Sequence, residues 1–175
     1  MTVSDFTIEN VTKEIENWIL NYLDHPSEHY NGMKPCPFAR EAWIKNKCHV
    51  LIGSEHMVHQ ILHTWDDQYE IVVVAIAEDE TEGLEEYCKM VNEELVEYGT
   101  DLVLMPFIAG DEDPDDPALK PESWGSIIDE AYSLVFVQRL SVVNRISEVL
   151  EKMGYYDKLS PESVSYTHLR AHETR

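Results

Sequence analysis

Apolar residues recur along the chain with two different spacings, and these spacings predict alternating helices and strands. From Ile8 to Leu23 they recur every three or four residues, which is the pattern of a helix with one buried face. Thr7 stands at the position expected for its N-cap. Helices are expected at 8–23, 37–46, 54–65, 82–98 and from 139 to a stop at Gly154, and strands at 48–52, 69–77, 101–108 and 133–138.

The apolar run Ile71–Ile76 has no polar interruption, which is typical of a central strand that is buried on both faces. Pro106 indicates an edge or a bend in the third strand, because proline has no N–H for the ladder. The alternation of strands and helices predicts a single α/β domain over residues 1–163, with a layered sheet of about four strands and flanking helices. A ferredoxin-like α+β arrangement, with its helices on one face, fits the same pattern.

The last residues of the chain differ in kind from the rest. Residues 164–174 read Val-Ser-Tyr-Thr-His-Leu-Arg-Ala-His-Glu-Thr, and this string resembles the translation of a transposon-based sequencing adapter. We therefore expect residues 164–175 to be a disordered, non-native tail and exclude them from the fold. The native C-terminus is then expected to be missing.

The charge balance narrows the classes of partner. Thirteen Lys and Arg residues stand against 34 Asp and Glu residues, for a net charge of −21. Such a surface repels phosphate, so nucleic acids and anionic membranes are not expected as partners. Three cysteines form no even disulfide framework, and the N-terminus lacks the basic and apolar regions of a signal peptide, which together favour a cytoplasmic location.

The segment Lys34–Arg40 contains the first candidate site. Cys36 lies between two prolines just before a predicted helix, and Pro37 is well suited to the first helical position. Cys36 would then be the N-cap, where free N–H groups and the helix dipole favour a reactive thiolate. We therefore expect Cys36 to be the catalytic candidate; the alternative is a buried cysteine with a structural role.

Three cations are candidates for holding an anionic small molecule near this thiol. Lys34 and Arg40 flank it in sequence, and Arg139 follows the last predicted strand. A guanidinium can grip a carboxylate or phosphate with two hydrogen bonds. A structural ion pair is the alternative reading of Arg139.

His56, His59 and His63 are a second candidate cluster. At about 100° per residue, the three side chains fall within one narrow arc of the predicted helix. Imidazoles so placed could hold a divalent metal ion. The apolar residues of this helix lie on the opposite face, so an exposed polar surface is the alternative reading.

The Cys-Pro-Phe-Ala motif at 36–39 also carries a family resemblance. Together with the order of the predicted elements, it resembles a bacterial family known as domain of unknown function 1415. The other matching features are Trp18, Ile71–Ile76, Met105–Phe107 and Arg139. The family typically has Phe-His-Pro after its third strand, where this chain has Phe107-Ile108-Ala109. The resemblance implies a fold and no established activity.

These features predict a small cytoplasmic protein that binds an anionic small molecule around Cys36, with or without thiol chemistry. One alternative is a non-enzymatic accessory domain that binds a partner protein, and another is a divalent-metal-binding protein. The sequence leaves the identity of any cofactor unknown. It contains no phosphate-cradling glycine loop, no Cys-x-x-Cys pair and no Gly-x-Ser-x-Gly elbow.

Overall fold

Strand β2 (Ile71–Ala77), which contains the uninterrupted apolar run, lies in the interior of a four-stranded sheet. On one side it pairs in parallel with β1 (Cys48–Ile52), and on the other it pairs antiparallel with β4 (Tyr132–Gln138). The edge strand β3 (Val103–Phe107) pairs antiparallel with β4, so the order is β1-β2-β4-β3. Pro106 therefore lies in an edge strand, as predicted.

A computed structural model gives this arrangement and describes residues 6–109 and 132–159. The predicted tail at 164–175 and the end of the predicted domain at 160–163 lie outside the described residues.

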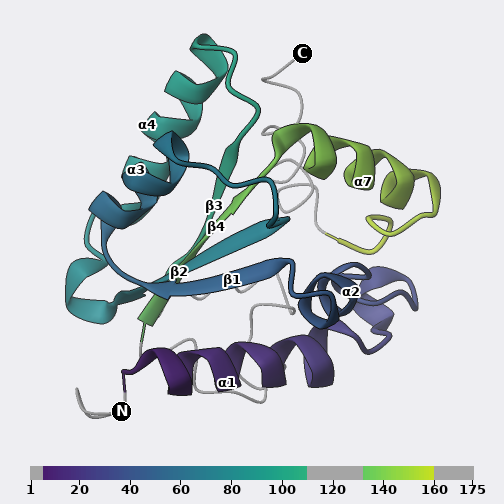
Figure 1. Cartoon of the computed structure of the whole chain (residues 1–175). Helices are drawn as coiled ribbons and strands as arrows, with labels where there is room; N and C mark the ends of the chain where they lie inside the picture. The colour runs from purple at the N-terminus through teal and green to yellow at the C-terminus, as the bar shows by residue number, and fades with distance from the viewer. Residues whose placement is uncertain (1–5, 110–131, 160–175) are drawn as a thin grey trace.

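Helices cover both faces of the sheet (Figure 1). They are α1 (Ile8–Trp18), α2 (Ala39–Ile44), α3 (Glu55–His63), α4 (Leu84–Glu97) and α7 (Leu140–Lys152), with a π-helical turn η2 (Ile19–Leu23) and 3-10 turns η3 (Glu28–Tyr30) and η4 (Glu78–Glu80). No helix in the described part of the chain combines the length and apolar character needed to cross a bilayer.

The alternation of side chains along β2 separates two apolar cores. Val73 and Ala75 point towards α1, whereas Val72, Val74 and Ile76 point towards α3 and α4. Burial on both faces explains why this strand has no polar position. The two helical layers and the parallel β1–β2 pair confirm the α/β prediction, and the chain does not form the one-sided ferredoxin-like alternative.

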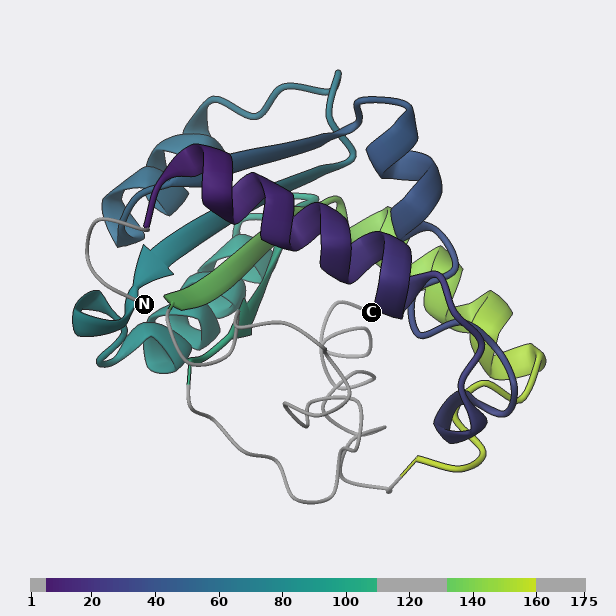
Figure 2. The same cartoon turned by 90° about the horizontal axis from the view of Figure 1, so that it is seen from below.

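Helix α1 crosses one face of the sheet, as Figure 2 shows. It begins as predicted, with the Thr7 side chain accepting a hydrogen bond from the Asn10 N–H at 3.2 Å. Val11, Ile15 and Trp18 form its buried stripe. After Trp18 the helix widens into the π-helical turn, and the chain then leaves the sheet.

The double-sided core gives a prediction for stability. Leu134 in β4 is fully buried beneath α1, so Leu134→Ala should lower the free energy of unfolding by about 2–5 kcal/mol. Val149→Ala removes an exposed apolar side chain from α7 and should change it by no more than about 0.5 kcal/mol. Urea denaturation of both variants measures the difference, and equal losses would contradict the assigned core.

Candidate functional site

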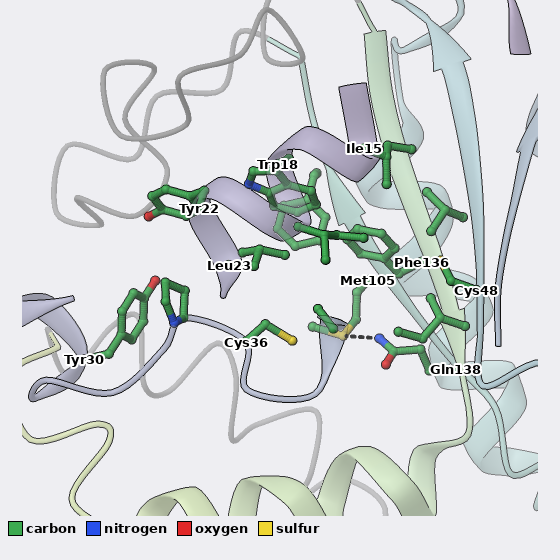
Figure 3. A pocket seen from close by; sticks show the side chains of 16 residues that line it. Ile15, Trp18, Tyr22, Leu23, Tyr30, Cys36, Cys48, Met105, Phe136 and Gln138 are labelled. Carbon is green, nitrogen blue, oxygen red and sulfur yellow. Dashed lines mark hydrogen bonds between the residues drawn. The ribbon is translucent and has the colours of Figure 1, made fainter. Parts of the chain in front are cut away.

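A cavity of about 280 Å³ lies between the end of α1 and the sheet. Its lining is mainly aliphatic and aromatic, and it includes two cysteines and one glutamine (Figure 3). The lining residues are Ile15, Trp18, Ile19, Tyr22, Leu23, Tyr30, Pro35, Cys36, Ala39, Cys48, Ile71, Val73, Met105, Phe107, Phe136 and Gln138.

The sheet supplies one wall of the cavity through residues that the strand register places side by side. Cys48 pairs with Ile71, and Ile71 pairs with Gln138, so these three side chains form one row across the sheet. In the next row, Phe136 meets the indole of Trp18, with ring centroids 6.1 Å apart and planes inclined by 10°. This stack joins α1 to the sheet beside the cavity.

The loop between η2 and α2 supplies the opposite wall. The Cys36 N–H donates to the Leu23 carbonyl at 3.3 Å, which holds the loop against the end of η2. The Tyr155 hydroxyl donates to the Pro35 carbonyl, and the Tyr155 ring stacks on Tyr30 with centroids 4.8 Å apart. A residue that follows α7 in the chain therefore fixes the wall that carries Cys36.

The structure places Cys36 in the wall of this cavity but not at the helix terminus predicted for it. Helix α2 begins at Ala39, and its N-cap is Phe38. Cys36 lies in the preceding turn, where its carbonyl accepts a hydrogen bond from the Ala39 N–H at 3.3 Å. The expectation that Pro37 opens the helix is therefore wrong by two residues.

The direction of the pKa shift expected for Cys36 is also wrong. Cys36 is partly exposed as a residue, but burial of its sulfur raises the thiol pKa. The backbone N–H groups of Phe38 and Ala39 reach the sulfur and oppose this shift without reversing it. Burial likewise raises the pKa of Cys48 to about 12. Both cysteines in the cavity are therefore protonated thiols at neutral pH.

Lys34 and Arg40 contact a carboxylate in place of the Cys36 thiol. The Lys34 ammonium donates to Asp24 at 2.7 Å, and the Arg40 Nε lies 3.4 Å from the second oxygen of the same carboxylate. The hydrogen bond from Lys34 is the main reason that the Asp24 pKa lies below its ordinary value. The cluster keeps one positive charge in excess. Each of its three residues is adjacent in the chain to a residue that lines the cavity. These lining residues are Leu23, Pro35 and Ala39.

Arg139 does not join this cluster. Its Nε donates to the Asp67 carboxylate at 3.2 Å, and its guanidinium lies 5.8 Å from the centre of the Trp65 ring. Trp65 packs against the core on the α3 face, opposite the face that bears the cavity. The structural ion pair is thus the reading that fits Arg139, and the anion-binding expectation for it is corrected.

The three histidines lie on the exposed face of α3, opposite the buried Val58 and Ile61. His59 and His63 meet, with their Nε2 atoms 3.0 Å apart. The Nε2 of His56 lies 3.3 Å from the Gln60 Nε2 and does not join them. Within residues 6–109 and 132–159, no three His, Cys, Asp or Glu side chains converge as metal ligands would.

Three residues of the site were not predicted from the sequence: Gln138, Met105 and Phe136. The sequence did contain an indication of Gln138. Leu134, Phe136 and Gln138 alternate along β4 and share one face, so a polar residue follows two apolar ones there. The signal for Met105 and Phe136 is no different from that of any core residue.

Comparison with known proteins adds no further constraint on the site. No family model matches the chain, and neither curated proteins nor solved structures give a match. The resemblance to domain of unknown function 1415 therefore stays a prediction, and the functional argument depends on the geometry of the cavity.

The buried thiol gives a prediction about reactivity. Alkylation of Cys36 by iodoacetamide should be slower than that of a free thiol at neutral pH, because only the thiolate reacts. Its rate should continue to rise above the ordinary thiol pKa of 9.0. Peptide mass spectrometry over a pH series measures the rate at each cysteine separately, with glutathione as the reference thiol. A rate that levels off below that pH would show that the site activates the thiol.

Proposed function

We propose that this protein binds a small molecule in the cavity that Cys36 lines, with the apolar part of the ligand inside and an anionic group at the rim. The observation that carries the proposal is the cavity itself, a space of about 280 Å³ between α1 and the sheet. Small-molecule sites are typically concave and apolar with a few polar groups, and this lining has that character. The three free cysteines suit a reducing cytoplasm.

Aromatic side chains support a ligand with a flat or elongated apolar body. Trp18 and Phe136 lie nearly parallel, and Phe107 meets both rings at steep angles, 74° to Trp18 and 75° to Phe136. Such rings contribute large apolar contact areas and lose little conformational freedom on binding. The gain on binding would come mainly from removal of apolar surface from water.

The excess positive charge beside the cavity supports the anionic part of the proposal. Asp24 neutralises one of two cations, and the side chains of Lys34 and Arg40 are 41% and 53% exposed. A ligand carboxylate could approach these cations without breaking a buried ion pair. The anion is therefore assigned to the rim, and the apolar body to the interior.

Burial argues against thiol chemistry at Cys36. A nucleophilic cysteine needs a thiolate, and burial disfavours that form at Cys36. The thiol can still contact a ligand as a weak hydrogen-bond donor or acceptor. We therefore assign Cys36 to the wall of a binding site.

Two fluorescent probes that differ by one sulfonate test both parts of the proposal. Phenylnaphthylamine is neutral, and anilinonaphthalene sulfonate has the same rings with a negative charge. Both should bind the wild-type protein. Lys34→Gln and Arg40→Gln should each weaken the sulfonate by about two- to five-fold, as expected for an exposed ion pair, and leave the neutral probe unchanged.

Lys13→Gln is the matched control, because it removes one exposed ion-paired lysine from the outer side of α1. It should leave the affinity of both probes unchanged. Absence of binding by the neutral probe would refute the cavity as a ligand site. Equal effects of Lys34→Gln on the two probes would refute only the anionic part.

A second candidate function, divalent-metal binding, is favoured by the contact between His59 and His63. Two imidazoles bound to neighbouring positions of one metal ion have their nitrogen atoms about 3 Å apart, given metal–nitrogen distances of about 2.0–2.1 Å. The Nε2 atoms of this pair are 3.0 Å apart on an exposed helix face. We propose a two-histidine site for Cu²⁺ or Ni²⁺, in place of the three-histidine site.

Titration with Cu²⁺ tests this second candidate. Replacement of either histidine, as in His59→Gln or His63→Gln, should weaken binding by roughly ten- to a hundred-fold, because one ligand is left where two acted together. His56→Gln, on the same helix face, should have no effect. Equal losses in all three variants would restore the three-histidine reading, and no loss in any would place the metal elsewhere.

A further inference from the structure

Gln138 is the last residue of β4, and its side chain lies on the face of the sheet that bears the cavity. The strand register places it between Ile71 of β2 and Val103 of β3. Gln138 is half-buried there, and a carboxamide among apolar neighbours is unusual, because taking it out of water without partners is unfavourable. The position therefore calls for a reason other than packing.

The partners of this carboxamide satisfy only part of its capacity. The Gln138 Nε2 donates to the Met105 sulfur at 3.3 Å, and a thioether is a weak acceptor. Figure 3 shows this contact, with the amide nitrogen turned towards Met105 on the side of the cavity where Cys36 lies and the carbonyl oxygen left beside it. Within residues 6–109 and 132–159, no side-chain group and no loop N–H donates a hydrogen bond to the Gln138 carbonyl oxygen.

Two cysteines and Tyr22 in the lining are less suited to accept a hydrogen bond from a ligand. The sulfurs of Cys36 and Cys48 are weak acceptors. In Figure 3 the hydroxyl of Tyr22 points away from Cys36, Met105 and Gln138. The oriented amide oxygen of Gln138 is thus the strong acceptor that the sheet wall offers.

We infer that Gln138 determines specificity in this cavity by accepting a hydrogen bond from a hydroxyl or N–H group on the buried end of the ligand. The inference rests on the proposed function and narrows its ligand class. The ligand is an apolar ring or chain that carries a donor at one end and an anionic group at the other. An apolar ligand without the donor would leave the amide oxygen unpaired and would bind less tightly.

The test compares naphthol with methoxynaphthalene, which has the same rings and oxygen atom but no donor. Each ligand displaces the neutral probe phenylnaphthylamine from the protein. The wild-type protein should prefer naphthol by about five-fold, the usual effect of one neutral hydrogen bond. Gln138→Met, which keeps the length of the side chain and removes the amide, should abolish this preference and retain probe binding.

Gln60→Met is the matched control, because it makes the same exchange at an exposed glutamine on α3, outside the cavity. It should retain the preference for naphthol. If Gln138→Met keeps the preference for naphthol, the inference is overturned. If the wild-type protein binds the probe without preferring naphthol, the inference fails and the proposed function stands; if the probe does not bind at all, both fail.

A second measurement uses only the wild-type protein, so it does not require that a variant fold correctly. Naphthol added to the wild-type protein should shift the side-chain amide signals of Gln138 in the NMR spectrum, and methoxynaphthalene should shift them less. Equal shifts for the two ligands would overturn the inference.

Discussion

The packing of Trp18 on Phe136 is the contact on which the cavity depends. The two rings lie nearly parallel, and Phe107 closes against both, so the end of α1 is joined to the sheet by aromatic side chains. Large rigid rings hold two backbones apart where smaller side chains would let them approach. The space next to this contact is bounded by the loop that carries Cys36, and that loop is held by Tyr155 from beyond α7.

The two walls of the cavity have different chemistry. The sheet contributes one oriented amide within an apolar surface, whereas the loop contributes a protonated thiol and, outside it, a cluster with excess positive charge. Under the proposed function, the two ends of the ligand would meet these two walls. Burial dominates the electrostatics of Cys36, and its chain neighbours Lys34 and Arg40 pair with Asp24.

Much of the fold could be predicted from local pattern. The run Ile71–Ile76 identified the interior strand, and Thr7 identified the start of α1, because each reflects burial or capping within a few residues. The insertion of β4 between β2 and β3 could not be predicted in the same way. It depends on pairing between segments about sixty residues apart, for which the apolar pattern sets no partner.

Less of the site than of the fold could be predicted from the sequence, again because residues that meet in the structure lie far apart along the chain. Cys36 was found because prolines mark it, but its expected activation assumed a helix that begins at Pro37, whereas α2 begins at Ala39. Lys34 and Arg40 were expected to hold an anion near the thiol. Their partner is Asp24, ten residues before Lys34. Arg139 is held by Asp67, which is 72 residues away. Charges close in sequence show which groups are available, and only the fold shows which of them meet.

The contact between Gln138 and Met105 also links the cavity to the oxidation state of its surroundings. A thioether is a weak acceptor, but its sulfoxide is a polar group with a strong acceptor oxygen. Oxidation of Met105 would place that oxygen beside the Gln138 amide and turn an apolar stretch of the wall polar. Under the proposed function, the oxidised pocket would favour a more hydrophilic ligand, and reduction of the sulfoxide would restore the apolar wall.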